Sequence, residues 1–376
     1  MFFYIVVFLL ISFFAYSFAK SWVASKQSVG YLLAFLLITC FMGFRYNIGR
    51  DFPGYWGDFN ILDETYFGLA RRYQFEYGYL FLLNCLHFWG LGPRSLFFST
   101  SLIITCLLFR IYKKNKELLP LGILCFLFCD PYEFSINGIR QAIAILAVIN
   151  AFEYFKPTYR WWHALLCYLL WIILGSLFHS SCIALLAAYP LRFINWERKP
   201  LPFILSILPL IGYVLNLSGL VVGLVDFSSF EVDESVRYGQ ELEDNYGNFA
   251  VGSNGLNLGT LLVLIFMMFP LAFKKNILRF YPNLNYLFPL YSIGTTVFFL
   301  YSGNMMINRL AYYFTFTLLL LFPALVKSWI KSKKSNYQVF LLGFFGWYLV
   351  RFMYTMLFDP GRILWPGAAL FGITFY

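Results

Sequence analysis

Long, uninterrupted apolar segments are the feature of this chain that most restricts its fold. A helix needs about 20 apolar residues to cross the hydrocarbon core of a bilayer, and fewer where it is buried or broken. Only 12% of the 376 residues are charged and 60% are hydrophobic, whereas soluble proteins are about 25% charged. The sequence therefore predicts an all-α polytopic membrane protein with about 11–14 transmembrane or half-membrane helices. The apolar runs lie at 1–19, 28–44, 77–90, 95–112, 118–130, 139–155, 161–178, 181–193, 201–224, 257–273, 284–302, 309–326 and 337–357, with a short final run at 363–376.

No polar stretch is long enough to form a separate soluble domain, because the longest has about 30 residues. We therefore expect residues 1–376 to form a single integral membrane domain. The longest polar loop, 226–256, is rich in glycine and asparagine and carries many acidic residues against Arg237 alone. This composition is typical of a mobile external segment, and a loop of this length in a tight bundle predicts a lid.

The lysines predict which ends of the helices face the cytoplasm, because basic residues concentrate in cytoplasmic loops. From Lys113 onward, lysine clusters alternate with lysine-free connections, which we place on the far side. The first third does not alternate in this way, since residues 45–75 and Lys113 fall on opposite sides but only two apolar runs separate them. The run 77–90 is short for a span, so we interpret it as a re-entrant or half-spanning helix. The lysine clusters are Lys20/Lys26, Lys113/Lys114/Lys116, Lys156, Lys199, Lys274/Lys275 and Lys327 to Lys334.

Several kinds of site have no motif in this sequence. All seven cysteines lie inside apolar segments, which predicts small buried side chains and no disulfide framework. We find no nucleotide-phosphate loop, metal-ligand set, nucleophile elbow or nucleic-acid module. We therefore expect no cofactor, no metal and no nucleic-acid partner.

Charged residues at the ends of apolar segments indicate one polar site built from distant parts of the chain. The places are the stretch from Arg45 to Tyr55, the stretch from Asn137 to Gln141, and Asn308-Arg309. Ionisable groups at membrane depth are costly and usually mark a pathway or a reaction site. The basic residues there are all arginines, whose planar fork binds phosphate through two parallel hydrogen bonds. The alternative is that arginine simply tolerates interfaces by extending its charged end to water.

Arg140 is the strongest single candidate in this set. It lies about one turn into an apolar helix, so it must face a partner or a polar cavity rather than lipid. Asn137, Gly138 and the helix N-terminus supply amide donors beside it, which favours an anion such as phosphate. An internal salt bridge to Asp130 or Glu133 is the alternative.

Asp51 and Glu76 are the best candidates for a general base from the residues alone. A carboxylate near an arginine keeps a low pKa and needs partial burial to act near neutrality. Either could instead be the structural counter-ion of an arginine. His179 lies at an external helix end, where a lone histidine is more often structural, and Arg309 at the start of another span has interfacial placement as its alternative.

Five short motifs follow one another in an order that resembles a known family. No single motif is specific, but their order, the chain length and the hydropathy together resemble the EpsG family of Wzy-type polysaccharide polymerases, from about residue 40 to 325. Phe52 stands where many relatives have a tyrosine after the aspartate, and an aromatic ring is retained. The motifs are Arg45-x3-Gly49-x-Asp51-x3-Tyr55, Glu76-x-Gly78-Tyr79, Asn137-Gly-Ile-Arg140-Gln141-x-Ile-Ala, Phe178-His179-Ser180-Ser181 and Arg309-x2-Tyr312-Tyr313-Phe.

The resemblance implies a GT-C-like helical bundle in the bacterial inner membrane, with its polar site facing the periplasm. The far side, on which we place the expected lid 226–256, is then the periplasm. It implies a glycosyltransferase that moves the growing glycan from undecaprenyl diphosphate onto the next undecaprenyl-diphosphate-linked repeat unit. The bilayer and the lipid-linked oligosaccharide are the expected partners, and a chain-length regulator and a flippase are further candidates. O-antigen polymerisation, and so lipopolysaccharide biosynthesis, is the expected process.

The resemblance also assigns roles to residues in the matched motifs. It raises His179 to a catalytic candidate beside Asp51 and Glu76, and we favour Asp51 as the base. The remaining site residues are expected to bind the diphosphate and the sugars: Arg45, Arg140, Gln141, Asn137, Arg309, Tyr55 and Tyr313. An O-antigen ligase-like transferase and a lipid-linked oligosaccharide flippase or exporter are the alternatives. A base beside the arginines favours a transferase over a flippase.

Overall fold

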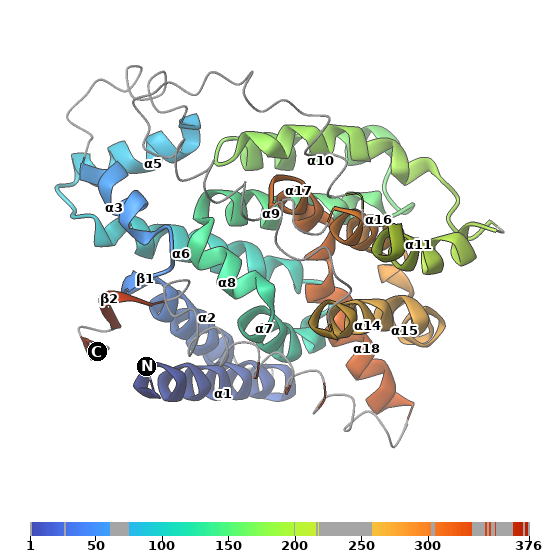
Figure 1. The fold of residues 1–376 in the computed structure, drawn as a ribbon, viewed down its shortest axis with the longest axis horizontal. Helices are drawn as coiled ribbons and strands as arrows, with labels where there is room; N and C mark the ends of the chain where they lie inside the picture. The colour runs from blue at the N-terminus through green and yellow to red at the C-terminus, as the bar shows by residue number, and fades with distance from the viewer. Residues whose placement is uncertain are drawn as a thin grey trace. The chain divides into compact units, whose positions relative to one another are not determined.

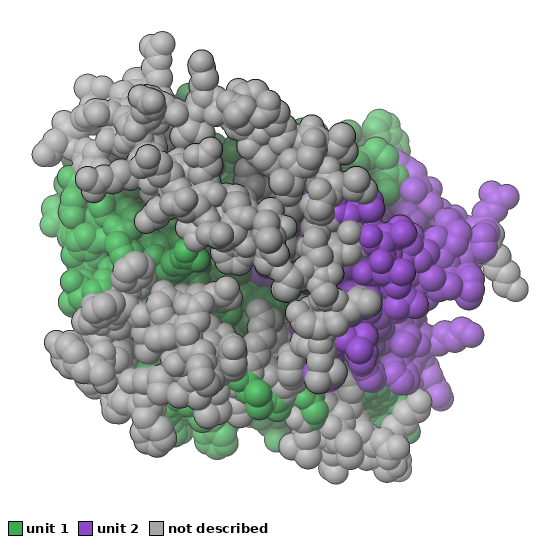
Figure 2. All heavy atoms as spheres, viewed as in Figure 1, with its two compact units in different colours: residues 1–192, 319–376 green, residues 193–318 purple. Residues whose placement is uncertain are grey.

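The computed structural model describes residues 2–25, 28–60, 75–198, 200–215, 217, 258–301, 305–332, 343, 346, 350, 364–370 and 373–374. Its helices fall into two compact units, residues 1–192 with 319–376 and residues 193–318 (Figure 2). The expected lid, 226–256, lies outside the described residues.

The described helices confirm the prediction of an all-α polytopic membrane protein. Three are long and apolar enough to cross a membrane: Tyr4–Ala24, Arg94–Ile111 and Ile307–Lys331. Two bent pairs pass the same test together, Lys116–Phe128 with Asp130–Asn137 and Leu261–Ala272 with Lys274–Phe280. Five shorter apolar helices accompany them, Val29–Gly43, Trp161–Ser176, Ser180–Phe193, Leu201–Leu215 and Leu287–Leu300.

The first unit is built around a buried helix, α9. Helices α1 and α2 pack together, α2 packs on α6, and α9 lies between α6 and α10 (Figure 1). Alanines on α9 let its neighbours approach closely, as small residues do in membrane bundles, and nearly all of its side chains are buried. The helices are α1 (Phe2–Ser25), α2 (Ser28–Gly43), α3 (Phe52–Asn60), α5 (Tyr77–Phe88), α6 (Arg94–Ile111), α7 (Leu119–Phe128), α8 (Asp130–Asn137), α9 (Ile139–Phe152), α10 (Trp161–Ser176) and α18 (Leu318–Lys331), with 3₁₀ helices at Lys116–Leu118, Glu153–Phe155 and Ser180–Phe193.

The connection before α9 is one of the lysine-free connections placed on the far side of the membrane, and it is itself helical. Helices α7 and α8 meet at a bend of 61°, and Cys129 between them has an extended backbone. Pro131 explains the new start, because proline favours the first turn of a helix and cannot continue the one before it. A second break at Gly138 separates α8 from α9. Arg140 therefore lies in the first turn of α9, which begins as a separate helix after this break.

A small antiparallel sheet holds the stretch after α2. Strand β1 (Arg45–Ile48) pairs with β2 (Leu364–Leu370), and β2 pairs with β3 (Ile373–Thr374). Asn47 and Gly49 have positive φ values of 51° and 103°, and the register shifts between Tyr46 and Ile48. This irregular strand turns the chain from α2 into α3.

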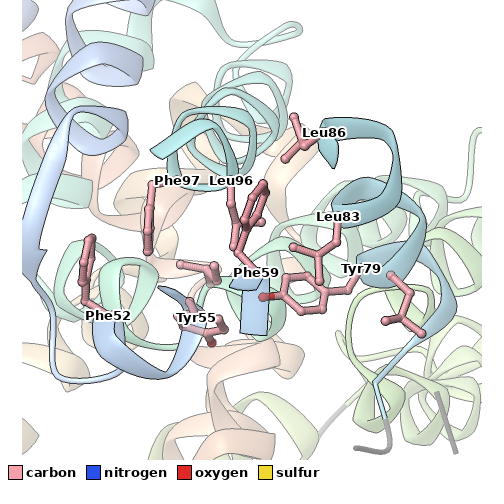
Figure 3. Close-up of a cluster of buried hydrophobic side chains, with 10 residues drawn as sticks. Phe52, Tyr55, Phe59, Tyr79, Leu83, Leu86, Leu96 and Phe97 are labelled. Atoms are coloured by element: carbon pink, nitrogen blue, oxygen red, sulfur yellow. The ribbon is translucent and has the colours of Figure 1, made fainter. Parts of the chain in front are cut away.

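An aromatic and aliphatic cluster fixes α3 and α5 against α6 (Figure 3). The rings of Phe52 and Phe97 stack with centroids 4.2 Å apart and planes within 9°. Phe59 and Tyr79 are fully enclosed in the same cluster. Because buried aromatic side chains make large contact areas, this cluster holds α3 and α5 in fixed positions.

The second unit packs around α16, which contacts α11, α14 and α17. The approach of α11 to α16 is close, since a Cβ on Gly212 would lie 2.6 Å from the Thr296 carbonyl oxygen. The Tyr291 hydroxyl donates to the Met267 carbonyl oxygen at 2.8 Å, which joins α16 to α14. The helices are α11 (Leu201–Leu215), α14 (Leu258–Ala272), α15 (Lys274–Phe280), α16 (Leu287–Leu300) and α17 (Met305–Thr315), with a 3₁₀ turn at Pro282–Leu284.

Candidate functional site

An ion pair between Arg140 and Glu76 lies at the centre of the candidate site. Arg140 Nη1 is 2.7 Å from Glu76 Oε2, and the two side chains are 26% and 12% exposed. The Arg140 guanidinium also lies over the rings of Phe75 and Tyr79, at 5.4 and 5.2 Å from their centroids. The anticipated internal partner of Arg140 was Asp130 or Glu133, but the ion pair that forms is with Glu76, from the start of α5.

Glu76 also joins α5 to the segment after α10. Its second oxygen, Oε1, accepts the backbone N–H of Ser180 at 3.0 Å. The backbone N–H groups of Gly78 and Tyr79 both donate to the Leu177 carbonyl oxygen, at 2.8 and 3.2 Å. Gly78 permits this approach, because a Cβ there would lie 2.6 Å from Leu177 Cβ. The motifs at 76–79 and 178–181 are therefore brought together.

His179 lies half-buried in this junction with a defined tautomer. The backbone N–H of Ser181 donates to His179 Nδ1 at 3.3 Å, and the Ser181 hydroxyl is 2.7 Å from the same nitrogen. A backbone N–H can only donate, so Nδ1 acts as an acceptor and the proton of the neutral ring lies on Nε2. The neutral imidazole can therefore donate a hydrogen bond from Nε2.

Asp58, on α3, is a site residue that the sequence reasoning did not select. The Tyr79 hydroxyl donates to Asp58 Oδ2 at 3.3 Å. Asp58, Tyr55 and Tyr79 all lie close enough to Arg140 to interact with it electrostatically. Burial raises the pKa of Asp58 to about 6, against the opposing effects of Arg140 and the Tyr79 hydrogen bond.

A helical pattern in the sequence could have revealed Asp58. Asp51, Tyr55 and Asp58 follow a spacing of four and three residues, which places them on one face of a helix. Pro53 and Gly54 are residues typical of turns and hide this pattern, whereas the structure has α3 at Phe52–Asn60. Proline in the first turn is compatible with a helix.

Arg45 is enclosed by protein and ties two helix ends together. Its side chain is 2% exposed, and its two terminal nitrogens donate to the carbonyl oxygens of Met42 at 2.7 Å and Ile136 at 3.4 Å. Its guanidinium lies 5.0 Å from the centroid of Phe97. These carbonyls belong to the last turns of α2 and α8, where helices leave acceptors without partners in the helix. These contacts give Arg45 a structural role, and the binding of a diphosphate by Arg45 stays a prediction.

The turn that carries Asp51 packs on the junction of α8 and α9. The Arg50 backbone N–H donates to Asn137 Oδ1, and Asn137 Nδ2 donates to the Glu133 carbonyl oxygen at 2.9 Å. A Cβ on Gly49 would lie 2.6 Å from the Ile136 carbonyl oxygen. Asp51 is half-buried directly before α3. Asn137 therefore positions the loop of Asp51 beside the helix of Arg140.

Three expected site residues remain: Gln141, which follows Arg140 on α9, and Arg309 and Tyr313, which belong to the second unit. Gln141 is 3% exposed on α9. Arg309 and the buried Tyr313 belong to α17 in the second unit, so their part in the site stays a prediction. Within the ranges that the structure describes, no three His, Cys, Asp or Glu side chains are grouped to hold a metal ion.

The helices and the enclosed cluster of arginine, carboxylates and tyrosines define the class: a polytopic membrane protein with an ionisable site in its interior. The model of the EpsG family matches residues 28–366. The chain belongs to the EpsG family. Membership supports a transferase role at a coarse level. No curated protein and no solved structure matches the chain.

Proposed function

We propose that this chain is a Wzy-type polysaccharide polymerase of the bacterial inner membrane, with its site open to the periplasm. It transfers the growing glycan from undecaprenyl diphosphate to a hydroxyl of the next undecaprenyl-diphosphate-linked repeat unit. The observation that carries the proposal is the position of Arg140, a partly exposed arginine held between Glu76 and two aromatic rings.

Arg140 suits the binding of a diphosphate. Its side chain is 26% exposed, so an anion can reach it, and the rings of Phe75 and Tyr79 hold the guanidinium plane in place. Glu76 is its counter-ion in the structure. A diphosphate carries more negative charge than one carboxylate and matches the guanidinium fork, so it can share or replace that partner.

The leaving group also needs a donor. Undecaprenyl diphosphate gains negative charge as the glycosidic bond breaks, and fixed donors stabilise such charge in a transition state. His179 as a neutral imidazole with its proton on Nε2 is a suitable donor. Apolar side chains that remain exposed on the helices, such as Phe81 and Phe88 of α5, offer the kind of surface that polyprenyl chains require.

The surface glycan of a deletion strain tests this function against its alternatives. A strain without this chain should keep glycan with a single repeat unit and lose all longer chains, and the gene supplied in trans should restore them. Loss of all surface glycan would point instead to a flippase, an exporter or a ligase-like transferase. The control is the same strain carrying an empty vector.

A further inference from the structure

We infer that Asp58 is the general base of this site, taking the proton from the attacking sugar hydroxyl of the acceptor. The inference rests on the proposed glycosyl transfer. It names a catalytic residue that lies outside the matched sequence motifs. Three observations support it: the neighbours of Asp58, the contacts made by both oxygens of Glu76, and the charged groups around Arg140.

The neighbours of Asp58 form one cluster with the candidate diphosphate ligand. Asp58 projects from α3, Tyr79 from α5 and Arg140 from α9. The Tyr79 hydroxyl donates to Asp58 Oδ2 at 3.3 Å, and Tyr79 also lies under the Arg140 guanidinium at 5.2 Å. One tyrosine therefore touches both the carboxylate and the arginine. A base in this position lies beside the bound diphosphate, where the acceptor hydroxyl must approach.

Glu76 is less suited to this role, because both of its oxygens are engaged. Oε2 pairs with Arg140 at 2.7 Å and Oε1 accepts the Ser180 N–H at 3.0 Å. Among the described residues, Asp58 accepts one hydrogen bond, through Oδ2. Its other oxygen, Oδ1, is the one that can accept a proton from a substrate. Asp51 remains the competing candidate from the sequence.

The charge of the cluster favours a proton acceptor at Asp58. The groups that face it are Tyr55 on its own helix, Tyr79 on α5 and Arg140 on α9. Asp51 lies close to Tyr55, and Glu76 pairs with Arg140. Burial raises the pKa of Asp58 to about 6. An ordinary aspartate has a pKa of about 3.9, so Asp58 is the stronger base and is still mostly ionised at pH 7.

The transfer step balances with this assignment. The acceptor oxygen forms a bond to the anomeric carbon of the donor glycan, and the bond from that carbon to the diphosphate oxygen breaks. Undecaprenyl diphosphate leaves with the bonding electron pair. The hydroxyl proton passes to Asp58, which then releases it to water. No oxidant, reductant or cofactor takes part.

Chain extension by the purified full-length protein, reconstituted in vesicles, tests the assignment. The substrate is the lipid-linked repeat unit extracted from the deletion strain, and kcat/KM is measured from pH 5 to 8. Loss of a general base typically costs about 10²–10⁴-fold in rate. The kcat/KM of Asp58→Asn should fall by a factor in this range, and its pH profile should no longer decline below pH 6. Undecaprenyl diphosphate should still bind to this variant. Glu117→Gln is the matched control, since it removes a carboxylate from an exposed pair with Lys331.

Tyr79→Phe distinguishes an acid limb caused by Asp58 from one caused by another group of the site, such as His179. The Tyr79 hydrogen bond lowers the pKa of Asp58, so its removal should move the acid limb to higher pH. The same change leaves a limb caused by His179 in place. This variant also decides the question if Asp58→Asn does not fold, because a limb that stays in place overturns the assignment.

Three other outcomes would overturn it. The first is that Asp58→Asn keeps its kcat/KM within about tenfold of the wild-type value, against the loss expected when a general base is removed. Asp51→Asn could remove the acid limb while Asp58→Asn retains it. If the wild-type protein makes no polymer, the proposed function fails and this role fails with it, whereas extension by both wild type and Asp58→Asn overturns the base alone.

Discussion

Glu76 and Arg140 are 64 residues apart in the sequence, and their side chains meet at 2.7 Å. This contact joins the start of α5 to the first turn of α9, and through Ser180 it also reaches the segment after α10. Three of the five motifs that resemble the EpsG family meet at this point. The pair therefore links the fold of the first unit to its candidate chemistry.

The planar fork of Arg140 is expected to matter as much as its charge. Arg140→Lys should shorten the polymer almost as severely as Arg140→Ala. Lysine cannot pair with a diphosphate through two parallel hydrogen bonds or pack on the rings of Phe75 and Tyr79 as a planar guanidinium does. The measurement is polymer length in the deletion strain, with protein level checked by immunoblot. Full-length glycan from Arg140→Lys would show that charge alone is sufficient.

The contact of α5 with the end of α10 is expected to need glycine at position 78. Gly78→Ala would place a Cβ 2.6 Å from Leu177 Cβ and 2.7 Å from its carbonyl oxygen. The two segments that carry Glu76 and His179 must then move apart. Polymer length should therefore fall even where the protein level is normal.

Gly57→Ala on α3 is the matched control for this change. A Cβ at Gly57 meets nothing within 4 Å, and alanine is favoured over glycine in a helix by about 1 kcal/mol. Polymer length should therefore stay normal in Gly57→Ala. Equal loss in both variants would mean that the tight approach at Leu177 is not the cause.

Arg45 is expected to act mainly on stability. Arg45→Ala removes the donors to Met42 and Ile136 and opens a cavity beside Phe97. Losses of this kind typically cost about 2–5 kcal/mol of unfolding free energy. The amount of folded protein after detergent extraction and the thermal midpoint should both fall. A stable Arg45→Ala protein that makes no polymer would instead support direct binding of the diphosphate.

The loop 226–256 is expected to lie in the periplasm, on the evidence of its lysine-free composition. A single cysteine in place of Ser253 should react with a membrane-impermeant thiol reagent in intact cells whose outer membrane has been permeabilised. The comparison is a cysteine at Ser335, in the lysine-rich stretch, which should react only after lysis. The opposite pattern would reverse the topology of the second half.

The sequence is sufficient for the membrane class, but not for the contacts within the site. Apolar runs show which segments span, because burial in lipid requires them. They do not show how each helix is rotated, and rotation decides that Arg140 meets Glu76 rather than Asp130 or Glu133. Pro53 and Gly54 are residues typical of turns, so the sequence did not indicate α3 or the position of Asp58 on that helix. The pairing of β1 with β2 depends on residues at opposite ends of the chain, which local patterns do not connect.

The count of undecaprenyl diphosphate released by the reconstituted protein tests the central claim most directly. Vesicles with the purified chain and the extracted lipid-linked repeat unit should release one undecaprenyl diphosphate for each repeat unit added, and the product should remain attached to lipid. Arg140→Ala in the same vesicles provides the background. Movement of the substrate across the bilayer without release, or transfer to an acceptor that carries no undecaprenyl diphosphate, would contradict the account.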